Sequence, residues 1–210
     1  MIPTALLGGS FNPAHDGHRR ISLFAARALG LDDVWWLVSP GNPLKQGATD
    51  MAPLAARVRA AQARTRHSPI RATAIEQQLG TRFTVDTLSK LVRRYPNRRF
   101  VWLMGSDNLA QFHQWKDWRR IASTLVIAVI ARPGYEGTAR ASRAMAGLRK
   151  FVRPANRSKH WTEWRPPALV LLRFHPDPRS ATAIRRAHPD WYRSFSNRPV
   201  RDSVTRHMID

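Results

Sequence analysis

The apolar residues of this chain follow two alternating patterns. Short runs rich in apolar residues, each of strand length, occur at residues 4–7, 34–38, 70–75, 100–104, 125–131 and 169–174. Other segments carry apolar residues every three or four positions, as one face of an amphipathic helix does, at 18–29, 53–66 and 85–95. Strands separated by helices predict an α/β fold with a doubly wound parallel sheet. A length of 210 residues fits a single domain.

One stretch follows neither pattern. Residues 138–165 hold eight Lys and Arg against the single acid Glu163. Prolines stand at 154 within this stretch and at 166 and 167 directly after it. We therefore expect a basic, loop-rich segment at about 138–167. After the last strand we expect a helical part at about 181–210.

The loops that follow the strands are the places to look for chemistry, because ligands of such folds bind at the carboxyl ends of the strands. Residues 8–18 read Gly-Gly-Ser-Phe-Asn-Pro-Ala-His-Asp-Gly-His between the first strand and the first helix. The glycines let the backbone approach a phosphate, and the first amides of the helix are orphan donors with partial positive charge. His15 and His18 can point at the same oxygen atoms, which suits stabilisation of charge at a phosphorus centre. The loop is neither a Walker A loop nor the dinucleotide G-x-G-x-x-G fingerprint.

Five further segments accompany this loop. They are Ser-Pro-Gly-Asn-Pro-Leu-Lys at 39–45, Thr-Arg-Phe-Thr-Val-Asp-Thr-Leu at 81–88, Gly-Ser-Asp-Asn-Leu at 105–109 with Gln-Trp-Lys-Asp-Trp at 114–118, Arg-Pro-Gly-Tyr at 132–135 and Arg-Ser-Ala-Thr-Ala-Ile-Arg at 179–185. Together they resemble the (H/T)-x-G-H nucleotidyltransferase superfamily and, within it, the bacterial nicotinate-nucleotide adenylyltransferase family, over nearly the whole chain. Members of that family join ATP and nicotinic acid mononucleotide to give the dinucleotide and pyrophosphate. The resemblance therefore implies a Rossmann-like nucleotidyltransferase fold and a role in NAD biosynthesis.

The resemblance also implies roles for single residues. The implied catalytic residues, which neutralise charge, are His15, His18, Lys45 and Arg185. The implied ATP-binding residues are Gly8, Gly9, Ser10, Phe11, His15, Gly17, His18, Asp107, Ser180, Thr182 and Arg185. The implied residues for the mononucleotide are Asn12, Lys45, Thr84, Trp115 and Arg132. The chain departs from the family pattern at Asn12, Phe83 and Ala181, where Asp, Tyr and Ser are usual. Read locally, Thr84 is also expected to be the N-cap of a helix that begins at Val85.

Charge and composition change this picture only in part. Lys and Arg number 35 against 14 Asp and Glu, a formal net charge of +21, which favours anionic partners. A basic nucleic-acid-binding protein is the alternative from another class, but no recognition element concentrates the charge, so no specific nucleic acid is expected. Nicotinamide mononucleotide and phosphopantetheine remain alternative substrates of the same chemistry.

The remaining expectations concern the metal, the compartment and the assembly. No carboxylates cluster in the sequence, so we expect Mg²⁺ to be held mainly by the ATP phosphates. The absence of cysteine and of a long apolar run favours a cytoplasmic protein with no membrane partner. The oligomeric state stays open, a homo-oligomer included.

Overall fold

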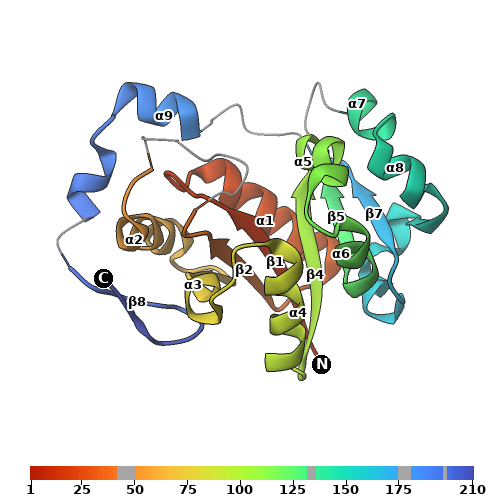
Figure 1. The fold of residues 1–210 in the computed structure, drawn as a ribbon, viewed down its shortest axis with the longest axis horizontal. Helices are drawn as coiled ribbons and strands as arrows, with labels where there is room; N and C mark the ends of the chain where they lie inside the picture. Colours follow the sequence, from red (N-terminus) through yellow and green to blue (C-terminus); the bar gives the residue numbers. More distant parts are fainter. Residues whose placement is uncertain (42–50, 132–135, 175–180, 196–197) are drawn as a thin grey trace.

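A seven-stranded sheet forms the centre of the molecule (Figure 1). The computed structural model describes residues 1–41, 51–131, 136–174, 181–195 and 198–210. The strand order is β3-β2-β1-β4-β5-β7-β6, and all six neighbouring pairs are parallel. The strands are β1 (Ile2–Gly9), β2 (Asp33–Val38), β3 (Ile70–Thr73), β4 (Arg98–Gly105), β5 (Val126–Ile130), β6 (Val152–Arg153) and β7 (Leu169–Leu172). The doubly wound parallel sheet predicted from the apolar pattern is confirmed.

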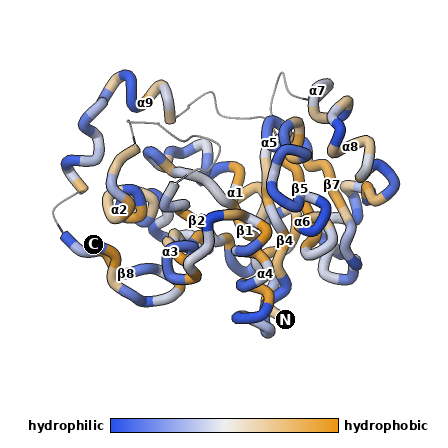
Figure 2. Tube along the Cα trace, viewed as in Figure 1, coloured by the Kyte–Doolittle hydropathy of each residue, from blue (hydrophilic) through white to orange (hydrophobic). Residues whose placement is uncertain are grey.

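Helices cover both faces of this sheet. One face carries α1 (Asp16–Leu29), α2 (Leu54–Thr65) and the 3-10 helix η4 (Ala155–Glu163). The other carries α3 (Ile75–Leu79), α4 (Thr84–Arg94), α5 (Ser106–Gln111), α6 (Trp118–Thr124) and α8 (Arg143–Leu148). Along β1, Ala5 and Leu7 pack on the first face and Leu6 on the second, as the two-residue period of a strand requires. Figure 2 shows the apolar residues gathered on these strands and on the inner sides of the helices.

The basic stretch is more ordered than the sequence predicted. It folds into α7 (Glu136–Arg140), α8, the 3-10 helix η3 (Arg149–Phe151), the short strand β6 and η4. Trp161 anchors η4: its side chain is fully buried, and its Nε1 donates to the carbonyl of Leu29 at 2.9 Å. The expectation of a loop-rich segment is therefore wrong for most of it, because this indole and an apolar face on α8 give the segment its own contacts with the core.

The C-terminal part combines helices and strands. It contains α9 (Ala181–Ala187), the 3-10 helix η5 (Trp191–Phe195) and an antiparallel pair of strands, β8 (Val200–Arg201) and β9 (Met208–Ile209). Asp202 fastens this hairpin to the sheet, since its buried carboxylate accepts from the hydroxyl of Thr73 at 2.9 Å and from the N–H of Ala74 at 2.7 Å. The predicted helical part is thus wrong for the residues of the hairpin.

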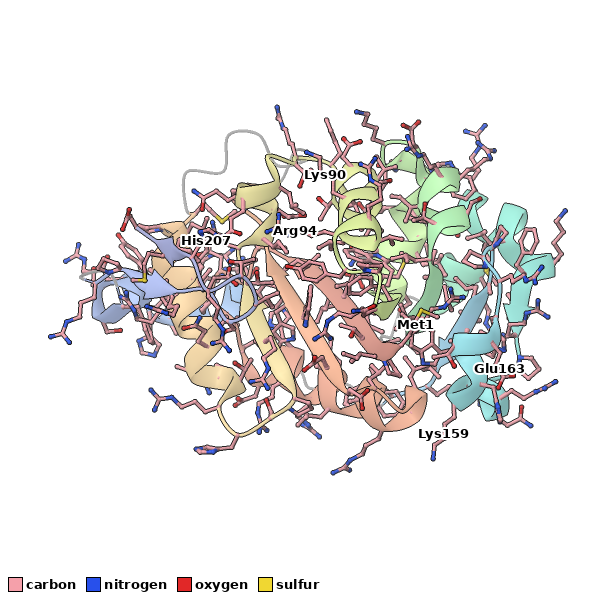
Figure 3. All side chains as sticks on the ribbon, turned by 90° about the horizontal axis from the view of Figure 1, so that it is seen from below. Met1, Lys90, Arg94, Lys159, Glu163 and His207 are labelled. Atoms are coloured by element: carbon pink, nitrogen blue, oxygen red, sulfur yellow. The ribbon has the colours of Figure 1, made fainter. Side chains whose placement is uncertain are left out.

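The carboxyl ends of the central strands define one edge of the molecule. In Figure 1, β4 runs upward into α5, and α9 lies along the same upper edge. Figure 3 looks from the opposite edge, where Met1, at the amino end of β1, lies near the middle of the view. Among the described residues, no helix combines the length and the apolar character that crossing a bilayer needs.

Candidate active site

The loop after β1 is shaped by close packing around two glycines. A Cβ added at Gly8 would lie 2.7 Å from Cη2 of Trp102 on β4, so only glycine fits beneath that indole. Phe11 follows with a φ of 46°, and its buried ring stacks on Trp36 at a centroid distance of 4.9 Å and an interplanar angle of 16°. The backbone therefore turns sharply and is held there by aromatic packing.

His15 and His18 lie together at the start of α1. Their ring centroids are 3.8 Å apart, and the ring of Phe11 lies 4.9 Å from that of His18. His15 is the N-cap, and its Nδ1 accepts from the N–H of Gly17 at 3.1 Å. His18 completes a capping box, because its Nδ1 accepts from the N–H of His15 at 3.2 Å. These bonds satisfy two of the amides that a helix start leaves without an intrahelical partner.

The capping bonds also fix the chemistry of the two rings. A ring nitrogen that accepts a hydrogen bond carries no hydrogen, so in both neutral imidazoles the hydrogen is assigned to Nε2. Each histidine thus keeps Nε2–H as the donor that can meet a phosphoryl oxygen. The positive end of the α1 dipole adds to the attraction for an anion at this point.

Arg185 reaches the same loop from the far end of the chain. Its Nη1 donates to the carbonyl of Asn12 at 2.8 Å. The buried side chain of Asn12 accepts from the N–H of Ala52 at 3.3 Å, just before α2 begins. The loop therefore connects α9, α2 and the two histidines, and it holds a guanidinium at Asn12, three residues before the first histidine.

A second group of predicted residues lies on the other face of the sheet. Trp115 packs edge-on against Trp102, with ring centroids 6.3 Å apart. Its neighbour Lys116 places Nζ 4.4 Å from the ring centre of Phe83 and 3.7 Å from the carboxylate of Asp86. Lys116 thereby links the start of α4 to the segment that carries Trp115. Since Trp102 also covers Gly8, this second group adjoins the loop after β1.

Thr84 is placed in this second group, but it is not the N-cap. Helix α4 begins at Thr84, and Phe83 is the N-cap, with no side-chain capping bond. The carbonyl of Phe83 accepts from the N–H of Asp86 and of Thr87, so Thr84 already lies inside the first turn. The prediction of Thr84 as N-cap is therefore wrong by one residue.

Asp107 lies in the first turn of α5, directly after β4. A cavity of about 590 Å³ opens at this turn. Ser106 and Leu109 of α5 line it, together with residues at the ends of β5 and β7 and residues of α1, α7, α8, β6 and η4. Its apolar floor and its place at the carboxyl edge fit a flat aromatic ligand.

Comparison with known proteins agrees with this geometry. The model of the cytidylyltransferase-like family matches residues 6–187. A probable nicotinate-nucleotide adenylyltransferase of Erythrobacter litoralis is 62% identical over 208 residues, which cover 99% of this chain and 94% of that protein. One from Cereibacter sphaeroides is 47% identical over 197 residues, 94% of this chain and 90% of that protein. The chain belongs to the nicotinate-nucleotide adenylyltransferase family.

A solved structure shares the fold. The Plasmodium falciparum nicotinic acid mononucleotide adenylyltransferase complexed with NaAD has a TM-score of 0.66 and 16% identity, and the match covers 89% of this chain and 83% of that chain. At this identity the likeness concerns the fold, and it agrees with the parallel sheet described above.

Four further residues with roles implied by the family resemblance differ in whether the structure describes them. Lys45, Arg132 and Ser180 lie outside the described residues. Thr182 is exposed on α9, where it lines a cavity of about 540 Å³ together with Arg185. The roles of all these side chains stay predictions.

One buried and one half-buried ionisable residue, Arg57 and Glu76, were not predicted from the sequence. Arg57 of α2 is 1% exposed, and burial lowers the pKa of its guanidinium to about 10. Burial also raises the pKa of Glu76 on α3 to about 7, against the opposing effect of a hydrogen bond from Thr87. The one available signal for Arg57 was its position next to Val58, on the apolar side of a predicted amphipathic helix.

The described residues do not fit a magnesium ion held by the protein itself. No group of three or more His, Asp or Glu side chains within them is placed to hold a metal. The imidazoles of His15 and His18 are, moreover, poor ligands for a hard cation that prefers oxygen.

Proposed function

We propose that this chain transfers the adenylyl group of ATP to nicotinic acid mononucleotide and releases pyrophosphate, a step of NAD biosynthesis. The observation that carries the proposal is the histidine pair at the start of α1, with both Nδ1 atoms used for capping and Arg185 held on the same loop. Two Nε2–H donors at the helix start, with a guanidinium on the loop that leads into it, form a site for a phosphoryl group that changes its charge distribution.

The reaction is an in-line displacement. A phosphate oxygen of the mononucleotide forms a bond to the α-phosphorus of ATP, and the bond from that phosphorus to the bridging oxygen of the β-phosphate breaks. The bonding electrons leave with pyrophosphate, and no covalent enzyme intermediate is needed because the nucleophile is already ionised. His15 and His18 donate to the α-phosphoryl oxygens, and Arg185 with Lys45 neutralises phosphate charge.

The ATP side of the site follows the loop after β1 and the edge at α5. Gly8, Gly9 and Ser10 let the triphosphate approach the backbone, and Phe11, Gly17 and the histidines hold the turn. Asp107 accepts hydrogen bonds from the ribose, and the 590 Å³ cavity next to it receives the adenine. Ser180 and Thr182 supply hydroxyls to the phosphates.

The mononucleotide side lies on the face that carries α4. The first amides of α4 around Thr84 bind the pyridine carboxylate, and Trp115 offers a flat face to the pyridine ring. Asn12, Lys45 and Arg132 complete this side toward the phosphate. Phe83, which replaces the usual Tyr, keeps an aromatic wall here and gives up one hydroxyl.

Three further parts of the proposal concern the metal, the cellular compartment and the oligomeric state. Magnesium enters as MgATP, part of the substrate and bound to its phosphates, which agrees with the lack of a carboxylate cage among the described residues. A chain without cysteine suits the reducing cytoplasm, which we propose as its compartment. A homo-oligomer is compatible with the proposal and is not required by it.

The test replaces both histidines by asparagine. Asparagine Oδ1 can accept the capping bonds that Nδ1 accepts, so the start of α1 is kept, but the two Nε2–H donors are lost. We expect kcat for pyrophosphate release from MgATP and nicotinic acid mononucleotide to fall about 10³-fold or more. The melting temperature should stay close to that of the wild type.

His160→Asn is the matched control. Its imidazole is exposed on η4, 3.4 Å from the carboxylate of Glu163, which lies toward the right edge of Figure 3. This control should keep wild-type turnover. A double asparagine variant that also kept near-normal turnover would remove the histidine pair from the mechanism.

A further inference from the structure

The most unusual buried group near the site is the guanidinium of Arg57. It is 1% exposed, and in the described part of the chain all of its hydrogen-bond partners are main-chain carbonyl oxygens. Nε donates to Ala52 at 2.8 Å, Nη1 donates to Ser10 at 2.8 Å and to Ser39 at 2.7 Å, and Nη2 approaches Pro40 at 3.4 Å. A buried cation that has no carboxylate partner among the described residues is costly, so its presence calls for a reason.

The four carbonyls belong to three separate segments that border the phosphate site. Ser10 lies in the loop after β1, and Ser39 and Pro40 form the exit of β2. Ala52 precedes α2, and its own N–H donates to the side chain of Asn12. A further bond joins the first two segments, from the N–H of Ser39 to the carbonyl of Gly9 at 3.0 Å.

The shape of the guanidinium explains why arginine stands here. Its planar fork presents five N–H donors in fixed directions, so one side chain can hold several carbonyls at once. A lysine keeps the charge, but it offers a compact ammonium that cannot reach the same set of acceptors. With a pKa of about 10 the group also stays protonated at neutral pH.

The direction of the four bonds matters for an anionic substrate. A carbonyl oxygen carries partial negative charge and repels a phosphate when it faces one. Arg57 draws the carbonyls of Ser10 and Ser39 toward the interior, and its buried positive charge lies directly behind the loop. Low dielectric surroundings strengthen this effect.

We propose that Arg57 is a positioning residue, which fixes the three segments around the phosphates and supplies positive charge from behind the loop. It touches no substrate and acts through the backbone of Ser10, Ser39 and Ala52. This inference rests on the proposed adenylyl transfer. Misplacement of a catalytic loop by about 1 Å costs on the order of 10²-fold in rate, which sets the size of the expected effect.

The experiment compares two test variants, Arg57→Lys and Arg57→Ala, with two control variants, Arg66→Lys and Arg66→Ala. Arg66 is the exposed residue at the end of the same helix. All proteins are assayed at 10 °C, on the fraction that elutes as folded protein, for kcat and for the KM of each substrate. We expect both Arg57 variants to lose kcat by about 10²-fold with KM changed less than about 5-fold. Added guanidinium ion should restore at least a tenth of the lost kcat in Arg57→Ala only.

The outcomes separate the two proposals. Wild-type protein that makes no dinucleotide contradicts the proposed function itself. Active wild type together with Arg57→Lys within 2-fold of its kcat, or loss matched by the Arg66 variants, overturns the positioning role. Failure of Arg57→Lys to fold even at 10 °C also overturns it, because Arg57 would then be needed for folding and not for placement of the loop.

Discussion

At the end of β1, the lack of a side chain at Gly8 decides how closely the backbone can pack against its neighbours. Gly8 lies under the indole of Trp102, and the loop that carries the histidines starts two residues later. A side chain at Gly8 would push against a ring that is 3% exposed and that itself packs against Trp115. The packing of the loop after β1 and that of Trp115 are therefore linked through one glycine.

Gly8→Ala tests this link. The added Cβ would sit 2.7 Å from Cη2 of Trp102, so the buried indole must shift. We expect the free energy of unfolding, measured with urea, to fall by about 1–3 kcal/mol. Gly137→Ala on α7 is the control, because nothing lies within 4 Å of its added Cβ, and it should be neutral or stabilising by up to about 1 kcal/mol. Equal stability of the Gly8 variant and the wild type would contradict the packing argument.

Some of these residues could be predicted from the sequence and others could not, for physical reasons. His15 and His18 were predictable because three residues along a helix start bring two side chains to one place. Arg57 was not, since an arginine on a helix is normally solvated and its four acceptors come from distant parts of the chain. The N-cap of α4 was predicted one residue too late, at Thr84 and not at Phe83, because the N-cap here makes no side-chain bond, and only such a bond gives Thr its capping preference.

At the scale of elements, α3 and α4 meet around the half-buried carboxyl group of Glu76. The hydroxyl of Thr87 lies 3.3 Å from Oε1 of Glu76 and 2.9 Å from the hydroxyl of Thr81, and Thr87 is fully buried. Burial raises the pKa of Glu76 from its ordinary value of 4.5 to about 7. The folded protein therefore binds this proton more tightly than the unfolded chain does.

The sign of the pH effect follows from this difference. Between about pH 4.5 and 7 the folded state holds a proton that the unfolded chain has lost, so stability falls as the pH rises through this range. Glu76→Gln removes the titrating group and keeps an acceptor for Thr87. At pH 8 we expect its free energy of unfolding to be about 1–3 kcal/mol higher than that of the wild type. Near pH 5 we expect the two free energies of unfolding to be close.

Urea unfolding at pH 5, 6, 7 and 8 checks this expectation. Glu163→Gln on the exposed end of η4 is the control, because its carboxylate is largely solvated. It should leave the dependence of stability on pH unchanged. A Glu76 variant whose stability follows the wild type at every pH would show that this carboxyl does not titrate as burial implies.

The helices and strands with the most regular apolar pattern were the ones that the sequence predicted. The long runs at β2, β4 and β5 and the stripe of α1 stood out because burial on both faces, or on one, leaves a regular signal. The segment from α7 to η4 did not, since its helices are short and its fit to the core depends on Trp161. The two-residue strands β6, β8 and β9 are too short to carry any period at all.

At the scale of the whole molecule, the parallel sheet gathers loops from distant parts of the chain at one edge. The sequence predicted that edge as the site of chemistry, and the structure brings the loops after β1, β2 and β4 and helix α9 there. The sequence could not predict the strand order, which depends on packing over the whole chain. The net charge of +21 suits a protein that gathers two anionic substrates.

The most direct test of the proposed function is the release of pyrophosphate with MgATP and each of three acceptors at equal concentration. These are nicotinic acid mononucleotide, nicotinamide mononucleotide and phosphopantetheine. We expect release with the first, with a kcat/KM at least about 10-fold above either of the others, because the proposed site at the first amides of α4 would favour a carboxylate over a neutral group. Release with none of the three, or with phosphopantetheine as the best acceptor, would contradict the proposed function.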